Sequence, residues 1–128
     1  IFPCDEFLAS RFTGLYIHRD DRVMPYLEVY LRHPKFAGIE IGWDTPLPEV
    51  RKILPSAKYH INMRGNPAWV KDASPSEIHS QIHAWIEEAG EPSSRFGLIF
   101  QDIDPDTPDD HVAALLENAD LGYNPGWL

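Results

Sequence analysis

Four short apolar segments alternate with helix signals along this chain, and this alternation constrains the fold more than any other feature. The apolar segments have the length and composition of β-strands, and they span residues 14–18, 36–41, 58–63 and 96–100. Helix signals follow them over residues 23–31 and 47–54, from Ser74 to Gly90, and from Thr107 onward. Such an alternation predicts parallel strands joined by right-handed crossovers. The expected fold class is α/β, with four successive βα units.

Capping residues define two of the expected helix starts. Ser74-Pro75-Ser76-Glu77 combines an N-cap serine, a proline at the first helical position and a glutamate three residues after the cap. Before the last helix, Thr107 is the expected N-cap and Pro108 the first helical residue. The segment 96–100 has no helical period and is interpreted as a strand buried on both faces.

Two parallel architectures fit this order of elements. One is a doubly wound open sheet of four strands. The other is half of a (β/α)8 barrel, whose full length is about 250 residues. No Gly-x-Gly-x-x-Gly follows the first strand, and no Walker-type phosphate loop occurs in the 128 residues. The nucleotide-binding version of the open sheet therefore has no support in the sequence.

The composition limits the classes of partner and compartment. The chain has 20 acidic and 11 basic residues and a formal net charge of -9, which opposes a broad surface for nucleic acid or anionic membrane. No apolar run approaches the roughly 18 residues of a membrane span. Cys4 is the single cysteine, so the sequence excludes an internal disulfide and a cysteine-based zinc knuckle. The expected setting is a reducing cytoplasm.

Five segments resemble, in order, the motifs of one superfamily. Ile17-His18-Arg19-Asp20 is similar to a strand that ends in His-x-Cys-Gly or His-x-Asp-Gly. Ile39 to Glu49 is similar to the next strand and the segment that leads to a short helix, and Ile61 to Asn66 is similar to a Leu-x-Gly-Asn strand. Ala73 to Ile78 is similar to a Gly-Thr-Pro-Glu-Glu-Val helix start, and Ile103 to Pro108 is similar to an Ile-x-Pro-x-Thr-Pro turn. Together they resemble the C-terminal half of the uroporphyrinogen decarboxylase superfamily, which also contains cobalamin- and coenzyme M-linked methyltransferases. The resemblance implies that residues 1–128 form a single α/β domain, the C-terminal part of a larger (β/α)8 TIM barrel.

Candidate site residues lie at the carboxyl ends of the predicted strands, where barrel enzymes place their chemistry. The candidate catalytic residues are His18, Asp20 and Arg64. The candidate substrate-binding residues are Trp43, Asp44, Asn66 and Asp102.

Simpler roles are open to several of these residues. His18 could be a hydrogen-bonded structural histidine, and Trp43 could be a rim aromatic rather than a wall that stacks on a flat ring. Arg64 could pair with Asp44 or Asp102 across the barrel mouth, or it could hold a substrate carboxylate through two parallel hydrogen bonds.

The resemblance also implies a metal site. In the methyltransferase branch, zinc is held by a histidine, a cysteine two residues later and a cysteine before the Ile-x-Pro turn, and it activates a thiol. His18 matches the histidine, Asp20 the first cysteine and Gln101 the second. Such a set is harder and weaker for zinc than one with two thiolates. His18, Asp20 and Gln101 are therefore candidate ligands for zinc or another divalent metal, and His18 with Asp20 is alternatively an acid–base pair.

The expected function is that of a uroporphyrinogen decarboxylase-like barrel protein, foremost a corrinoid-linked methyltransferase that acts on a small molecule, with the corrinoid carried by a partner protein. The alternatives are a cofactor-free decarboxylase, a non-catalytic half-barrel that binds a ligand or a partner, and a metal-dependent hydrolase that uses His18, Asp20 and Asp102. Because open sheet edges promote aggregation, the remaining half-barrel or an oligomer is expected to close the sheet.

Overall fold

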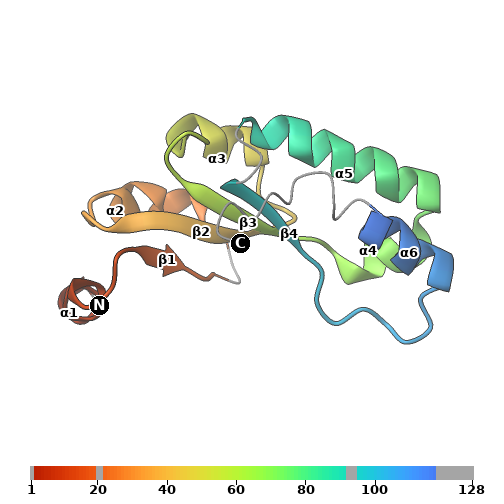
Figure 1. Cartoon of the computed structure of the whole chain (residues 1–128), viewed down its shortest axis with the longest axis horizontal. Coiled ribbons are helices and arrows are strands. Elements are labelled where there is room, and N and C mark those ends of the chain that lie inside the picture. Colours follow the sequence, from red (N-terminus) through yellow and green to blue (C-terminus); the bar gives the residue numbers. More distant parts are fainter. Residues whose placement is uncertain (1, 20–21, 92–94, 118–128) are drawn as a thin grey trace.

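The computed structural model describes residues 2–19, 22–91 and 95–117, which form an α/β fold around one four-stranded sheet (Figure 1). The strands are β1 (Leu15–Ile17), β2 (Phe36–Gly42), β3 (His60–Arg64) and β4 (Phe96–Ile99). They lie in the order β1-β2-β3-β4, and every neighbouring pair is parallel. The predicted α/β class with four parallel strands is confirmed.

Helices precede, connect and follow the strands. They are α1 (Phe2–Ser10), the short 3-10 helix η1 (Met24–Tyr26), α2 (Leu27–Leu31), α3 (Leu47–Ile53), α4 (Pro67–Asp72), α5 (Pro75–Ala89) and α6 (Asp109–Glu117). Figure 1 shows α2, α3 and α5 on the same side of the sheet. A doubly wound sheet reverses its strand order to place helices on both sides, whereas this sheet adds each strand next to the previous one. The strand order is therefore that of a half-barrel.

The two faces of the sheet have opposite character. Ile39, Ile41, Ile61 and Met63 point to one face, where they are fully buried against helix residues such as Val50. The other face, called the polar face below, carries Tyr16, Gly38, Glu40, His60, Asn62 and Arg64. Because side chains alternate between the faces of a strand, and paired residues of parallel neighbours share a face, the register fixes both sets.

Two expectations from the sequence are wrong: the capping role of Thr107 and the burial of β4 on both faces. The hydroxyl of Thr107 is buried without a hydrogen-bond partner in the described part of the chain, and the carbonyl of Pro108 instead accepts the first helical bonds, from the backbone N–H groups of His111 and Val112. Strand β4 is half-buried rather than buried on both faces. The reason is its place at the edge of the sheet, where no further strand among the described residues covers it.

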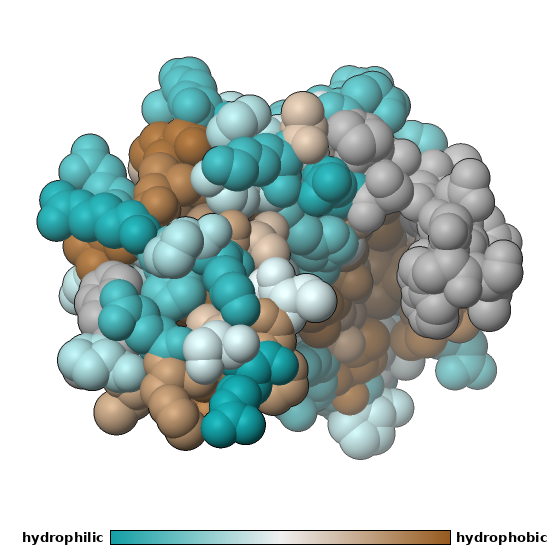
Figure 2. All heavy atoms as spheres, turned by 60° about the vertical axis from the view of Figure 1, so that its left-hand side comes forward, coloured by the Kyte–Doolittle hydropathy of each residue, from teal (hydrophilic) through white to brown (hydrophobic). Residues whose placement is uncertain are grey.

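The face of the molecule that carries α1 and β1 combines hydrophilic residues with exposed hydrophobic ones. Figure 2 shows this pattern on the side of the molecule that carries α1 and β1. Phe7 and Phe12, in and just after α1, are 63% and 64% exposed. Across the described ranges, none of the helices has both the length and the apolar character needed to span a membrane.

Candidate functional site

Three side chains from neighbouring strands meet on the polar face at the carboxyl ends of β1, β2 and β3. The Nδ1 atom of His18 lies 3.1 Å from Oε2 of Glu40. The Nε and Nη2 atoms of Arg64 both donate to Oε1 of the same carboxylate, at 3.1 and 2.7 Å. Nη2 of Arg64 also lies 3.5 Å from Nε2 of His18. These three residues are called the His18–Glu40–Arg64 cluster.

The strand register explains why the cluster forms. Ile17 pairs with Ile39, so His18 follows directly beside Glu40. Glu40 pairs with Asn62, and Arg64 lies two residues farther along β3 on the same face. A long arginine side chain spans that step and reaches back to the carboxylate. The cluster is therefore a consequence of three parallel strands in consecutive order.

Glu40 is the buried centre of the cluster. Its side chain is only 9% exposed, against 21% for Arg64 and 56% for His18. Burial alone would raise the pKa of Glu40, but the hydrogen bonds from Arg64 and His18 outweigh it and hold the pKa below its ordinary value. Glu40 is therefore an anion that fixes the orientation of its two neighbours.

This orientation determines what His18 can do chemically. When Nδ1–H donates to Glu40, proton exchange by the ring takes place at Nε2, which lies next to the guanidinium of Arg64. A carboxylate-held histidine is a usual general acid or base. Since the guanidinium is permanently charged and suited to carboxylates, the two side chains together fit an anionic substrate.

The ion-pair partner of Arg64 differs from the two that the sequence suggested. Asp44 and Asp102 were the expected candidates, but the guanidinium forms an ion pair with Glu40 and lies beside His18. Asp44 is exposed in the turn after β2, and Asp102 is exposed in the loop after β4 with a φ angle of 55°. Glu40 is closer because it stands on the adjacent strand, on the same face.

The other predicted site residues that the structure describes follow strand ends but do not belong to the cluster. Trp43 follows β2, three residues after Glu40, and is 48% exposed. The side-chain oxygen of Asn66 accepts a hydrogen bond from the backbone of Ala68 and thereby caps α4. Gln101 is exposed after β4, and Asp20 lies outside the described residues.

The described part of the predicted metal site does not converge on one point. In residues 2–19, 22–91 and 95–117, no group of three histidine, cysteine or acidic residues is placed to hold a metal ion. His18 follows β1 and Gln101 follows β4, the two outer strands, so three strand spacings, roughly 14 Å, separate their backbones along the sheet. Nε2 of His18 faces a guanidinium, which opposes a cation there. With Asp20 outside the described residues, the metal set stays a prediction.

Glu40 is the residue of the cluster that the sequence interpretation missed. It was treated as part of an apolar strand, Phe36 to Ile41. The available signal was its isolation: one charged residue inside an otherwise apolar strand needs a partner, because a lone buried charge is costly. Side chains alternate between the two faces of a strand, so Glu40 lies on the face opposite to Ile39 and Ile41. This alternation would have placed it on the polar face.

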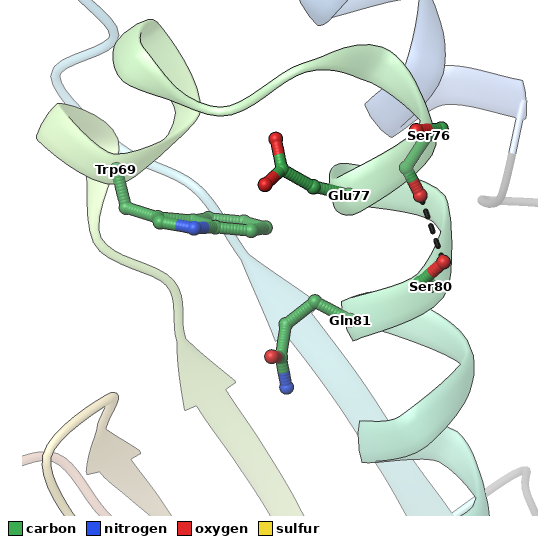
Figure 3. Close-up of a pocket in the computed structure, with 5 residues that line it drawn as sticks. All are labelled: Trp69, Ser76, Glu77, Ser80 and Gln81. Carbon is green, nitrogen blue, oxygen red and sulfur yellow. Dashed lines mark hydrogen bonds between the residues drawn. The ribbon is translucent and has the colours of Figure 1, made fainter.

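A hollow lies between α4 and the start of α5, away from the cluster residues (Figure 3). It has a volume of about 380 Å³ and is lined by Trp69, Ser76, Glu77, Ser80 and Gln81. The carboxylate of Glu77 accepts hydrogen bonds from the backbone and the hydroxyl of Ser74. Its charged group thus serves the helix cap, and the hollow has weaker chemistry than the His18–Glu40–Arg64 cluster.

No model of a known protein family matches the sequence, and no curated protein matches it.

Proposed function

We propose that this chain is part of a barrel enzyme of the uroporphyrinogen decarboxylase type, which binds an anionic small molecule at the polar face and uses His18 as a general acid or base. The observation that carries the proposal is the buried carboxylate of Glu40, which holds His18 and Arg64 side by side. An arrangement that fixes a proton-transfer group next to a permanent cation is what acid–base chemistry on an anion requires.

The reaction that fits best is a cofactor-free decarboxylation. The leaving carboxylate departs as carbon dioxide, the electron pair of the broken C–C bond stays on the substrate carbon, and protonated His18 delivers a proton to that carbon. Arg64 binds a second anionic group that the product retains, because a cation held on the leaving carboxylate would stabilise the ground state more than the transition state. We assign the contact with a flat ring of the substrate to Trp43, which is exposed just after β2.

A corrinoid-linked methyl transfer is the second candidate, and the contact between His18 and Glu40 favours it. Histidines that bind metals commonly donate their other ring N–H to a carboxylate. If held by His18 and Asp20, zinc would supply the charge that keeps a thiol substrate as its thiolate. Gln101, at the opposite edge of the sheet, would not reach the same ion. The corrinoid would be carried by a partner protein.

We further propose that other strands close the sheet along β1 and β4. In the described part of the chain these two strands lie at the edges with no neighbour beyond them. The remaining half-barrel or an oligomer would pair with both edges. The lone exposed Cys4 and the net charge of -9 suit a reducing cytoplasm and a small-molecule substrate rather than nucleic acid.

The test uses the complete native protein and two assays. Phthalate, isophthalate and pyrrole-2,4-dicarboxylate, each labelled with 13C in its carboxyl groups and each with a second carboxylate for Arg64 to hold, are followed for release of labelled carbon dioxide. Methylcobalamin with a thiol and zinc is followed for loss of the methyl group by visible absorbance.

We expect labelled carbon dioxide from a ring carboxylate, abolished in His18→Gln and retained in His83→Gln, an exposed histidine of α5 that serves as the matched control. His18 is 56% exposed, so its replacement should leave the fold intact by circular dichroism. Release that persists in His18→Gln contradicts the proposal. Zinc-dependent loss of the methyl group without carbon dioxide supports the second candidate instead.

A further inference from the structure

The polar face continues below the His18–Glu40–Arg64 cluster, toward the amino ends of the strands. Tyr16 and His60 flank Gly38 there, with ring centroids 6.1 Å apart. Asn62 joins the two rings: its backbone N–H donates to the hydroxyl of Tyr16 at 3.2 Å, and its Oδ1 lies 2.8 Å from Nε2 of His60. These three residues are called the Tyr16–His60–Asn62 layer.

Two glycines leave space for this layer. A Cβ atom at Gly38 would overlap the carbonyl oxygen of His60 and lie 3.0 Å from the ring of Tyr16. A Cβ atom at Gly97 would overlap the side-chain oxygen of Asn62. In a (β/α)8 barrel, bulky branched apolar residues normally fill the interior. Here glycines and polar side chains stand in the corresponding positions, which suits a ligand site rather than a packed core.

The hydrogen bonds of the layer leave one donor and one acceptor unused within the described ranges. Tyr16 accepts from Asn62, and no acceptor for its own O–H proton is found among the described residues. His60 donates from Nε2 to Asn62, so Nδ1 is the acceptor of that tautomer, and it too lacks a partner there. A planar group with neighbouring N–H and C=O would satisfy both.

We propose that the Tyr16–His60–Asn62 layer is a second subsite, which binds a planar cyclic amide while the cluster above binds an anionic substituent of the same molecule. The inference rests on the proposed function for the anionic end and adds the chemistry of the other end. Tyr16 and His18 are two residues apart on one face, a step of roughly 6.6 Å. A single six-membered ring with a carboxylate spans such a step.

Three probes separate the two subsites. Uracil offers the cyclic amide alone, benzoate offers the carboxylate alone, and orotate offers both on one ring. Each is titrated into the complete native protein and its variants, and binding is followed through backbone amide shifts in NMR spectra. Tyr16→Phe removes only the hydroxyl, Arg64→Gln removes the cation, and Tyr30→Phe in α2 is the matched control because its hydroxyl bonds Arg19.

We expect orotate to bind more tightly than either fragment. Tyr16→Phe should weaken uracil and orotate by about fivefold, the effect of one hydrogen bond, and leave benzoate unchanged. Arg64→Gln should weaken benzoate and orotate and leave uracil unchanged. Tyr30→Phe should change none of the three.

The two ideas fail in different ways. The second subsite is overturned if uracil produces no shifts on the polar face, or if Tyr16→Phe binds uracil as tightly as the wild type does, even while benzoate still depends on Arg64. Anion binding at the cluster is overturned if benzoate binds Arg64→Gln as tightly as the wild type. In that case, uracil binding that is weakened by Tyr16→Phe would still support the second subsite.

Discussion

One buried carboxylate, that of Glu40, orients both of the side chains to which we assign chemistry. Because its charged form accepts from Arg64 and His18, removing the charge loosens both neighbours at once. Hydrogen bonds to charged groups are stronger than neutral ones. Glu40 is accordingly the residue at which stability and function are most closely linked.

Glu40→Gln should lower the free energy of unfolding by about 2 kcal/mol near pH 7. The pKa of Glu40 in the folded protein lies below its ordinary value of 4.5. Its stabilisation is therefore present above the unfolded pKa and is lost as the pH falls through the lower, folded pKa. We expect the stability of Glu40→Gln to decline less steeply than that of the wild type below about pH 4.5.

Urea denaturation from pH 7 to pH 3, followed by circular dichroism, measures this difference. Glu28→Gln, at an exposed position of α2, is the control and should follow the wild-type curve. Identical pH profiles for Glu40→Gln and the wild type would mean that the carboxylate is not held by its neighbours as the structure shows.

The sequence located two of the three cluster residues but not the contact that joins them. His18 and Arg64 were predicted because polar residues at strand ends are readily recognised. Their shared partner was not, because an ion pair between β2 and β3 depends on the register of the strands. Asn66 shows the same limit: its position was predicted, yet its side chain caps a helix that the sequence interpretation did not include.

At the scale of elements, the best-defined prediction is the start of α5. The backbone and hydroxyl of Ser74 bond Glu77, and the hydroxyl of Ser74 accepts from the backbone of Glu77 at 3.4 Å, which completes a capping box. Ile78 and Ile82 behind the cap are buried, so the cap positions a helix that packs on the core. This confirms the expectation drawn from Ser74-Pro75-Ser76-Glu77.

Ser74→Ala should destabilise the protein by about 1 kcal/mol, because N-cap hydroxyls satisfy backbone donors that the first helical turn leaves unpaired. Ser80→Ala is the matched control, since the hydroxyl of Ser80 bonds the carbonyl of Ser76 inside the same helix. Thermal unfolding of both variants gives the comparison. Equal melting temperatures for the two variants would show that the capping box contributes nothing.

Elements with weak local signals were missed or misjudged. Helix α4 has six residues, too few for an apolar stripe to show a period. Helix α1, Phe2–Ser10, exposes Phe7 and Leu8 and so lacks the amphipathic pattern of a core-facing helix. At Thr107 the cap signal was present, but burial of the hydroxyl, a tertiary effect, kept it from capping.

At the scale of the whole molecule, the alternation of strands and helices predicted the class but left two architectures open. Both architectures share the same order of elements along the chain. Only the order of strands in space separates them, and that order depends on contacts between units far apart in sequence. The result is a sheet with an apolar face under helices and a polar face that carries both proposed subsites.

The most direct test of the central claim is a crystal structure of the complete native protein grown with benzoate. We predict the carboxylate within hydrogen-bond distance of Arg64 and Nε2 of His18, with Glu40 still joining the two. A benzoate bound away from the polar face, or a structure in which His18, Glu40 and Arg64 stand apart, would contradict the account.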